Sequence, residues 1–465
     1  MTPRQRFLLL LLLAVAARAS VAAVPLSAQV IAPSDSAIRA ILQERIESKR
    51  AVGLVAATLD HGRSTIFTAG SSGAPAVALD GNTVFEIGSI TKVFTASLLA
   101  DMVAKGEVRL DDPVAKYLPT SVRVPSRNGK QITLIDLATQ SSGLPRMPNN
   151  FTPANNENPY ADYTVAQLYA FLSGYELTRD IGSRYEYSNL GVGLLGHALA
   201  LRAGKSYEDL VTERILRPLG MNDTRIVLTP AMKSHLAPGH AASGNVVANW
   251  DLPTLAGAGA LRSTANDLLK FLAANLDSTS VPLGRELATT HFARRDVDGA
   301  QMRIGLNWHI LTALGPPIVW HNGGTGGYRT FIGFDEVNKR AAIVLSNQEI
   351  SADDIGFHLI DQRAPLAPPP STRVRTEITV DPTVLETYVG VYQLAPTFAI
   401  TITREGSLLF AQATGQSRFQ LFAEAPTEFF VKVVDAQITF EKDSTGKVVR
   451  LILHQGGQNV PGLKQ

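Results

Sequence analysis

The sequence of 465 residues contains no cysteine. This absence excludes disulfides, thiolate zinc sites, iron–sulfur clusters and a cysteine nucleophile. The chain also lacks an excess of either charge, because 43 Lys and Arg stand against 41 Asp and Glu, a net charge of +2. A nearly neutral chain has no basic field to hold a polyanion, so we expect no nucleic-acid partner. With 45 % hydrophobic and 18 % charged residues, the chain is typical of folded domains rather than of disordered or fibrous proteins.

Motifs of several other enzyme classes are missing as well. The sequence has no Gly-x-Ser-x-Gly nucleophile elbow, no Walker A run, no His-Glu-x-x-His and no Ser-Asp-Asn. His235 and His240 are five residues apart and have no acidic partner nearby, so we interpret them as surface or core residues. The sequence therefore predicts neither a metal nor a cofactor.

The N-terminus has the pattern of a secretory signal peptide. Arg4 and Arg6 precede an apolar run over 7–17, and small residues follow it. A membrane anchor is disfavoured because Arg18 ends the run, which is too short to cross about 30 Å of hydrocarbon. We predict that residues 1–28 are a cleaved leader and that the mature protein is periplasmic or secreted, with no stable membrane span.

Helices are indicated by apolar spacing and by capping residues. Residues 35–50 have helical spacing with Ser34 or Ser36 available as a cap, and apolar runs predict helices over 93–106 and 189–204. Further helix starts are predicted by capping boxes, which pair Thr133 with Asp136, Thr164 with Gln167, Ser206 with Asp209, Thr264 with Asp267, and Ser351 with Asp354.

Strand patterns occur at both ends of the region before residue 363. Residues 53–60 and 63–70 predict a hairpin around His61-Gly62, and further strand-like runs cover 317–320, 328–334 and 341–346. The N- and C-terminal pieces then complete one sheet, and the middle forms a second lobe. The predicted fold class is α+β, an antiparallel sheet flanked by helices plus a mostly helical lobe.

The last part of the chain changes in character. Residues 363–379 contain a proline-rich stretch that is stiff and extended, typical of a linker. Over 380–465, alternating apolar and polar residues with turn signals predict a small all-β barrel or sandwich. The predicted organisation is a leader, a main domain over 29–362, this linker and the β domain.

The first candidate for chemistry is Ser89-Ile90-Thr91-Lys92, directly before an apolar helix. Residues at i and i+3 share a helix face, so the Ser89 hydroxyl and the Lys92 amine can meet. A desolvated lysine can act as the base that a serine nucleophile needs. The pattern alone is weak, because Ser444-Thr445-Gly446-Lys447 matches it in a turn context.

Two later motifs strengthen this interpretation. Tyr187-Ser188-Asn189 stands just before a helix, where a phenol beside a lysine can move protons and an amide can hold a carbonyl. The segment from His321 to Tyr328 reads His-Asn-Gly-Gly-Thr-Gly-Gly-Tyr, and its glycines permit close approach of a ligand to a strand edge. His309 and Trp308 are instead predicted to serve packing.

With these three motifs in this order, the chain resembles the penicillin-recognising serine hydrolases of the class C β-lactamase and D-alanyl-D-alanine carboxypeptidase type. The resemblance covers roughly residues 35–362 and extends to the sequence segments around the motifs, such as FEIGSITKVFTASLLADMVAKGEVRLDDPVAKYLP and ILRPLGMNDT. It implies a β-lactamase/transpeptidase-like fold and a small-molecule or peptide substrate.

The resemblance also implies the role of each site residue. Ser89 is the acylated nucleophile, and Lys92 and Tyr187 share general-base and general-acid work. Asn189 orients the acyl amide, and the backbone N–H groups of Ser89 and Gly324 form the oxyanion hole. Substrate binding falls to Asn189, His321, Gly323 and Gly324.

One residue departs from the class C pattern. Class C β-lactamases usually have Lys where this chain has His321, whereas some carboxypeptidases of the family have His. An unperturbed His with a pKa of about 6.5 is largely neutral at physiological pH, so we expect weaker attraction of a substrate carboxylate. The sequence therefore predicts an exported acyl hydrolase of β-lactam or D-alanyl-peptide amides. A carboxylesterase, and a non-catalytic ligand-binding homologue, stay open as alternatives.

Overall fold

The computed structural model describes residues 32–277, 279, 281–297, 301–369, 375–395, 398–414, 418–431, 436–455 and 458–465. The predicted leader, residues 1–28, lies outside them. Within the described part, no helix is long and apolar enough to cross a membrane.

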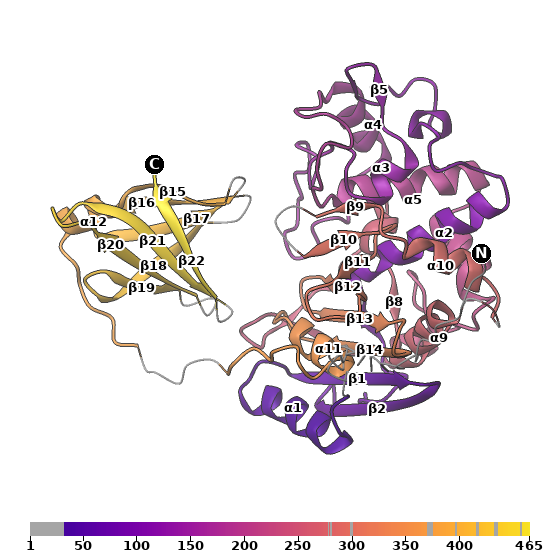
Figure 1. Cartoon of the computed structure of the whole chain (residues 1–465), viewed down its shortest axis with the longest axis horizontal. Coiled ribbons are helices and arrows are strands. Elements are labelled where there is room, and N and C mark those ends of the chain that lie inside the picture. Colours follow the sequence, from indigo (N-terminus) through magenta and orange to yellow (C-terminus); the bar gives the residue numbers. More distant parts are fainter. Residues whose placement is uncertain are drawn as a thin grey trace, which may run out of the picture.

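The first body of the structure is built on an eight-stranded antiparallel sheet in the order β2-β1-β14-β13-β12-β11-β10-β9 (Figure 1). The hairpin predicted at the N-terminus is present, and it pairs with the late strand β14 through Leu54 opposite Ser346. The two ends of this region therefore do complete one sheet, as predicted. The strands are β1 (Gly53–Asp60), β2 (Arg63–Gly70), β9 (Arg295–Asp296), β10 (Met302–Ile304), β11 (His309–Leu311), β12 (Ile318–Gly324), β13 (Arg329–Asp335) and β14 (Arg340–Ser346).

Helices cover both faces of this sheet because its central strands are apolar on both sides. Along β14, Ala342 and Val344 face a cluster with α1 and α11, whereas Ile343 and Leu345 face the large core with α2 and α9. The α-helices of this body are α1 (Asp35–Glu47), α2 (Thr91–Ala104), α3 (Leu134–Ala138), α4 (Val165–Gly174), α5 (Asn189–Ala203), α6 (Tyr207–Val211), α7 (Pro230–Lys233), α8 (Ala256–Gly259), α9 (Ala265–Leu276), α10 (Gly284–Thr290) and α11 (Asp353–Ile360).

Shorter elements complete this body. They are the 3₁₀ turns η1 (Gly88–Ile90) and η2 (Val114–Tyr117), the π-helical turn η3 (Thr212–Leu216), and the two-residue strands β3 (Phe85–Glu86), β4 (Ser126–Arg127), β5 (Lys130–Gln131), β6 (Gly239–His240), β7 (Val246–Val247) and β8 (Arg262–Ser263).

Four of the five predicted capping residues cap helices. Ser34 also caps α1, its hydroxyl accepting from the Ala37 N–H. The capping box predicted for Ser351 and Asp354 is wrong, because α11 begins at Asp353 after the uncapped Ala352. Asp354 is used elsewhere, since it pairs with Arg45 of α1 and accepts from the Ala367 N–H at 2.6 Å. The boxes of Thr133 before α3 and Thr164 before α4 are complete. Ser206 and Thr264 cap α6 and α9 by accepting from the N–H groups of Asp209 and Asp267.

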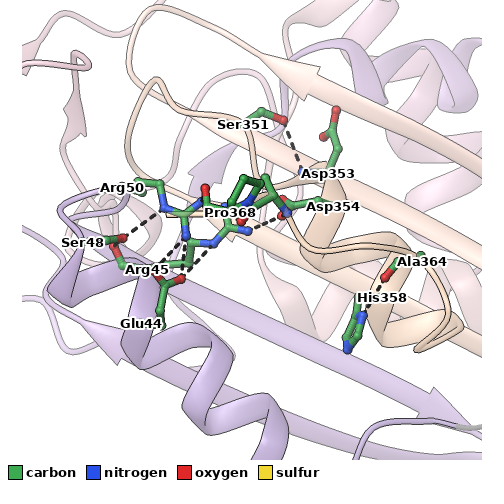
Figure 2. A network of polar contacts seen from close by, with 11 residues as sticks. Glu44, Arg45, Ser48, Arg50, Ser351, Asp353, Asp354, His358, Ala364 and Pro368 are labelled. Atoms are coloured by element: carbon green, nitrogen blue, oxygen red, sulfur yellow. Dashed lines mark hydrogen bonds and ion pairs between the residues drawn. The ribbon is translucent and has the colours of Figure 1, made fainter. Parts of the chain in front are cut away.

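The same network holds the chain as it leaves α11 (Figure 2). Arg50 donates to the carbonyl oxygens of Ala367 and Pro368, each at 3.1 Å, and pairs with Glu44 at 2.6 Å. The beginning of the predicted linker is therefore hydrogen-bonded to Arg50, which follows α1, and to Asp354 of α11.

The C-terminal part is a closed antiparallel barrel (Figure 1). Of the two predicted forms, barrel and sandwich, the barrel is the one present. It closes where β15 pairs with β22 through Tyr392 and Lys464. Helix α12 (Pro382–Tyr388) adds Leu385 and Tyr388 to its core. Its strands are β15 (Gly390–Ala395), β16 (Phe398–Glu405), β17 (Leu408–Ala413), β18 (Arg418–Ala425), β19 (Glu428–Val431), β20 (Ala436–Lys442), β21 (Val448–Gln455) and β22 (Gln458–Lys464). The predicted α+β class with an all-β C-terminal domain is confirmed.

Candidate active site

Ser89 lies in η1, which runs directly into α2, and Lys92 lies in the first turn of α2. The i, i+3 spacing brings the two side chains together, with the Lys92 Nζ 2.9 Å from the Ser89 Oγ. The Nζ also donates to the Ala258 carbonyl oxygen at 2.6 Å. Ser444 and Lys447 share the same spacing in an exposed turn, where Lys447 makes no such contact with the serine among the described interactions.

The Lys92 amine is completely buried, and its burial is the main cause of a pKa well below that of a free lysine. The positive charge of Arg146 lowers the pKa further. A lowered pKa increases the share of neutral amine at physiological pH. Neutral amine has a lone pair that can take the proton of the Ser89 hydroxyl.

Tyr187 lies beside this pair, just before α5, whose N-cap is Ser188. The Lys92 Nζ is 4.9 Å from the centre of the Tyr187 ring. Burial raises the pKa of Tyr187 to about 12, although its contact with Ser89 and the charge of Arg146 act in the opposite direction. The phenol is therefore protonated at neutral pH, a state suited to giving a proton to a leaving group.

Asn189 is the first residue of α5 and lines the cleft with Tyr187. Its Nδ2 donates to the Tyr160 hydroxyl at 3.2 Å. Its Oδ1 is buried and has no partner within the described part of the chain. A buried acceptor without a donor is costly, and the N–H of a bound amide can supply one.

Two glycines of β12, Gly323 and Gly324, bring the strand edge against the turn that carries Ser89. A Cβ at Gly88, which has a φ of +51°, would lie 2.7 Å from the Gly324 nitrogen. A Cβ at Gly323 would lie only 2.0 Å from the Ile87 carbonyl oxygen. Both glycines of β12 line the cleft, so close packing of two backbones puts the Gly324 N–H beside Ser89.

His321 is placed differently from its predicted partners. Its imidazole is fully buried, is absent from the cleft lining and packs against the rings of His309 and Tyr187 at 5.1 and 6.3 Å. Its Nδ1 lies 2.6 Å from the Asn322 carbonyl oxygen, and burial holds its pKa well below 6.5. A neutral, buried imidazole offers a substrate carboxylate no positive charge.

The cleft has a volume of about 540 Å³ and contains groups that the motifs did not indicate. His309, predicted to serve packing, lines the cleft and lies 2.9 Å from the Tyr185 hydroxyl through its Nε2, whereas Trp308 is in the core. Trp250 is held in the cleft wall by its N–H, which donates to the buried Glu86 at 2.9 Å. The remaining lining residues are Gly88, Ser89, Arg146, Met147, Tyr160, Tyr187, Asn189, Leu252, Ala258, Gly259, Asn322, Gly323, Gly324, Thr325, Arg329 and Glu349.

The described part of the chain contains no group of three or more histidine and carboxylate side chains that could hold a metal ion. His240 is buried with its Nδ1 3.0 Å from the Asn347 carbonyl oxygen, and His235 is exposed.

Buried histidines make the stability of the fold depend on pH. Burial lowers the pKa of His309 to about 4 and that of His291 to about 3. The unfolded chain, with His pKa values of about 6.5, therefore binds these protons first as the pH falls. The contribution of each histidine to stability is complete above about pH 6.5 and is lost as the pH falls to its pKa in the folded protein. At pH 4, the low pKa of His309 alone reduces the free energy of unfolding by about 3 kcal/mol.

Urea unfolding between pH 7 and pH 4 measures this effect, with His291→Gln as the test variant. Its Nε2 lies 2.6 Å from Asn275 Oδ1, and glutamine keeps a polar group there without titrating. We expect the variant to lose less unfolding free energy over this range than the native chain. Equal losses in both proteins would contradict the prediction.

Known proteins resemble this chain in sequence and in fold. The family model described as Beta-lactamase matches residues 38–363, and one described as a domain of unknown function (DUF3471) matches residues 374–461. The chain is 34 % identical over 265 residues to the D-alanyl-D-alanine-carboxypeptidase/endopeptidase AmpH of Escherichia coli, covering 54 % of this chain and 67 % of that protein.

Two further relatives cover more of the chain. Penicillin-binding protein 4* of Bacillus subtilis is 26 % identical, with 77 % of this chain and 83 % of that protein covered. The crystal structure of a class C beta lactamase from Rhodobacter sphaeroides is 25 % identical and superposes with a TM-score of 0.59, covering 68 % of this chain and 94 % of that one.

Proposed function

Since this chain belongs to the beta-lactamase family of serine hydrolases, we propose that it is an exported acyl hydrolase in which Ser89 is acylated by β-lactam or D-alanyl-peptide amides. The observation that carries the proposal is the 2.9 Å contact between the Ser89 Oγ and the buried Lys92 Nζ. This contact gives the serine a base whose pKa is lowered by burial.

In the proposed reaction, neutral Lys92 takes the proton of the Ser89 hydroxyl as its oxygen attacks the substrate carbonyl. The N–H groups of Ser89 and Gly324 stabilise the oxyanion, a contribution worth several kcal/mol when the oxyanion is desolvated. Asn189 Oδ1 accepts from the acyl amide. Tyr187, protonated at neutral pH, gives a proton to the leaving group, and water then hydrolyses the acyl-enzyme.

The experiment that tests this proposal is intact-protein mass spectrometry after brief exposure to a penicillin. Loss of the drug is followed in parallel, and Ser89→Ala is the control. We expect an adduct on the native protein and none on the variant, which means slow deacylation of the carboxypeptidase type. Drug consumption without a lasting adduct means a true β-lactamase. A result with neither an adduct nor consumption of the drug would contradict penicillin recognition.

A carboxylesterase is the second candidate. It is supported by the burial of His321, because the third motif then offers no positive charge to bind a substrate carboxylate. Hydrolysis of p-nitrophenyl butyrate in preference to any β-lactam or D-amino-acid amide favours it. A non-catalytic homologue has less support, because such a protein has no need of Ser89, Lys92 and Tyr187 in contact with one another.

A further inference from the structure

Two guanidinium groups line the cleft, and they differ in what they contact. Arg329 is occupied, since its Nη1 donates to the carbonyl oxygens of Thr325 and Tyr328 at 2.7 and 2.8 Å. Its Nη2 lies 3.2 Å from Glu349, the carboxylate among the cleft-lining residues. The charge of Arg329 is therefore opposed, and its N–H groups hold the turn after β12.

Arg146 has no such partners. Its backbone is fixed, because its carbonyl oxygen accepts from the Leu190 N–H at 3.2 Å. Its side chain is exposed at the cleft, with the guanidinium carbon 5.1 Å from the centre of the Tyr187 ring. Within the described part of the chain, no carboxylate or carbonyl oxygen contacts this guanidinium. The group presents unused donors and an uncompensated positive charge to whatever enters.

We propose that Arg146 binds a carboxylate on the leaving-group side of the substrate, in the place of the cation that His321 does not supply. The inference rests on the proposed function and narrows its substrate class to acyl-D-amino acids and related amides that carry a free carboxylate. Tyr187 is the proton donor to the leaving group, so a cation stacked on its ring lies on that side of the scissile bond. A guanidinium matches a carboxylate with two parallel hydrogen bonds.

Arg146 has a second effect that the test must separate. Its charge lowers the pKa of Lys92 and opposes the rise in the pKa of Tyr187, so its removal changes acylation of every substrate. A ratio between two ligands that differ only in the carboxylate cancels this common effect. The ratio of dissociation constants for such a pair is therefore the informative quantity.

The experiment measures binding of N-acetyl-D-alanyl-D-alanine and of its C-terminal amide to the Ser89→Ala protein by calorimetry. Charge-assisted pairing predicts that the acid binds about 10- to 100-fold more tightly than the amide. Adding Arg146→Ala removes this preference, and adding Arg146→Lys keeps part of it because the charge remains. Adding Arg109→Ala, which removes an exposed arginine paired with Asp111 outside the cleft, leaves the preference unchanged.

Three results would overturn the inference: equal binding of acid and amide, a preference that survives Arg146→Ala, or binding of neither ligand. Failure of the proposed function gives a different pattern. In that case the penicillin adduct on Ser89 is missing, whereas the Arg146-dependent preference for the acid is still measured.

Discussion

Replacing Lys92 by methionine is expected to slow acylation of Ser89 by a penicillin between about 10²- and 10⁴-fold, the usual contribution of a general base. Methionine keeps most of the length of the lysine side chain and suits a fully buried position, but it has no amine to accept a proton. The Ser89 hydroxyl then loses the group that lies 2.9 Å from it. The rate is measured as the appearance of the adduct mass with time.

The matched control is Lys105→Met, at the other end of the same helix. Lys105 is the C-cap residue of α2, and its exposed amine pairs with the buried Asp101 at 2.7 Å. This variant should be acylated at the native rate, so a loss confined to Lys92→Met cannot come from weakening of the helix. Acylation of Lys92→Met at the native rate would exclude Lys92 as the base.

The pH dependence gives an independent check on the same residue. A base works in its deprotonated form, so a lowered pKa of Lys92 moves the acid limb of the rate profile to lower pH. We expect the acid limb of the acylation profile to lie well below the pKa of a free lysine, about 10.4. A rate that rises steadily up to pH 10 would mean that the lysine titrates as a free amine.

Replacing Gly323 by alanine is the second change with a large expected effect. The new Cβ would lie 2.0 Å from the Ile87 carbonyl oxygen and 2.4 Å from the Thr330 hydroxyl. Because the first contact is with backbone, β12 has to move away from the turn that carries Ser89. Displacement of a catalytic donor by about 1 Å costs about 10²-fold in rate, so we expect kcat/KM to fall by at least that factor.

Stability should fall in the same variant by about 1–3 kcal/mol, as is usual for overpacking in a tight interior. The control is Gly174→Ala at the end of α4, where a Cβ meets nothing within 4 Å. Activity and urea unfolding are measured for both variants. Native activity in Gly323→Ala would show that the close approach of β12 to Ile87 does not set the geometry of the site.

Local signals in the sequence predicted local geometry well. The contact of Ser89 with Lys92, the hairpin around His61-Gly62 and the box of Thr164 with Gln167 each depend on residues two to four apart. Backbone geometry decides such contacts almost alone. The failure of Ser351 and Asp354 to form a box has a tertiary cause, because Asp354 pairs with Arg45, 309 residues away in the sequence.

The sequence by itself determined the α+β class, the all-β C-terminal part and, through a resemblance, the set of residues around Ser89. Only the tertiary structure decided which of these residues line the cleft. Alternation along β12 puts the His321 ring among Tyr187 and His309, and the same fold leaves Arg146 exposed at the cleft. The physical reason is that burial and unopposed charge depend on side chains from segments far apart in the sequence. A short motif does not specify which of those segments will pack against it.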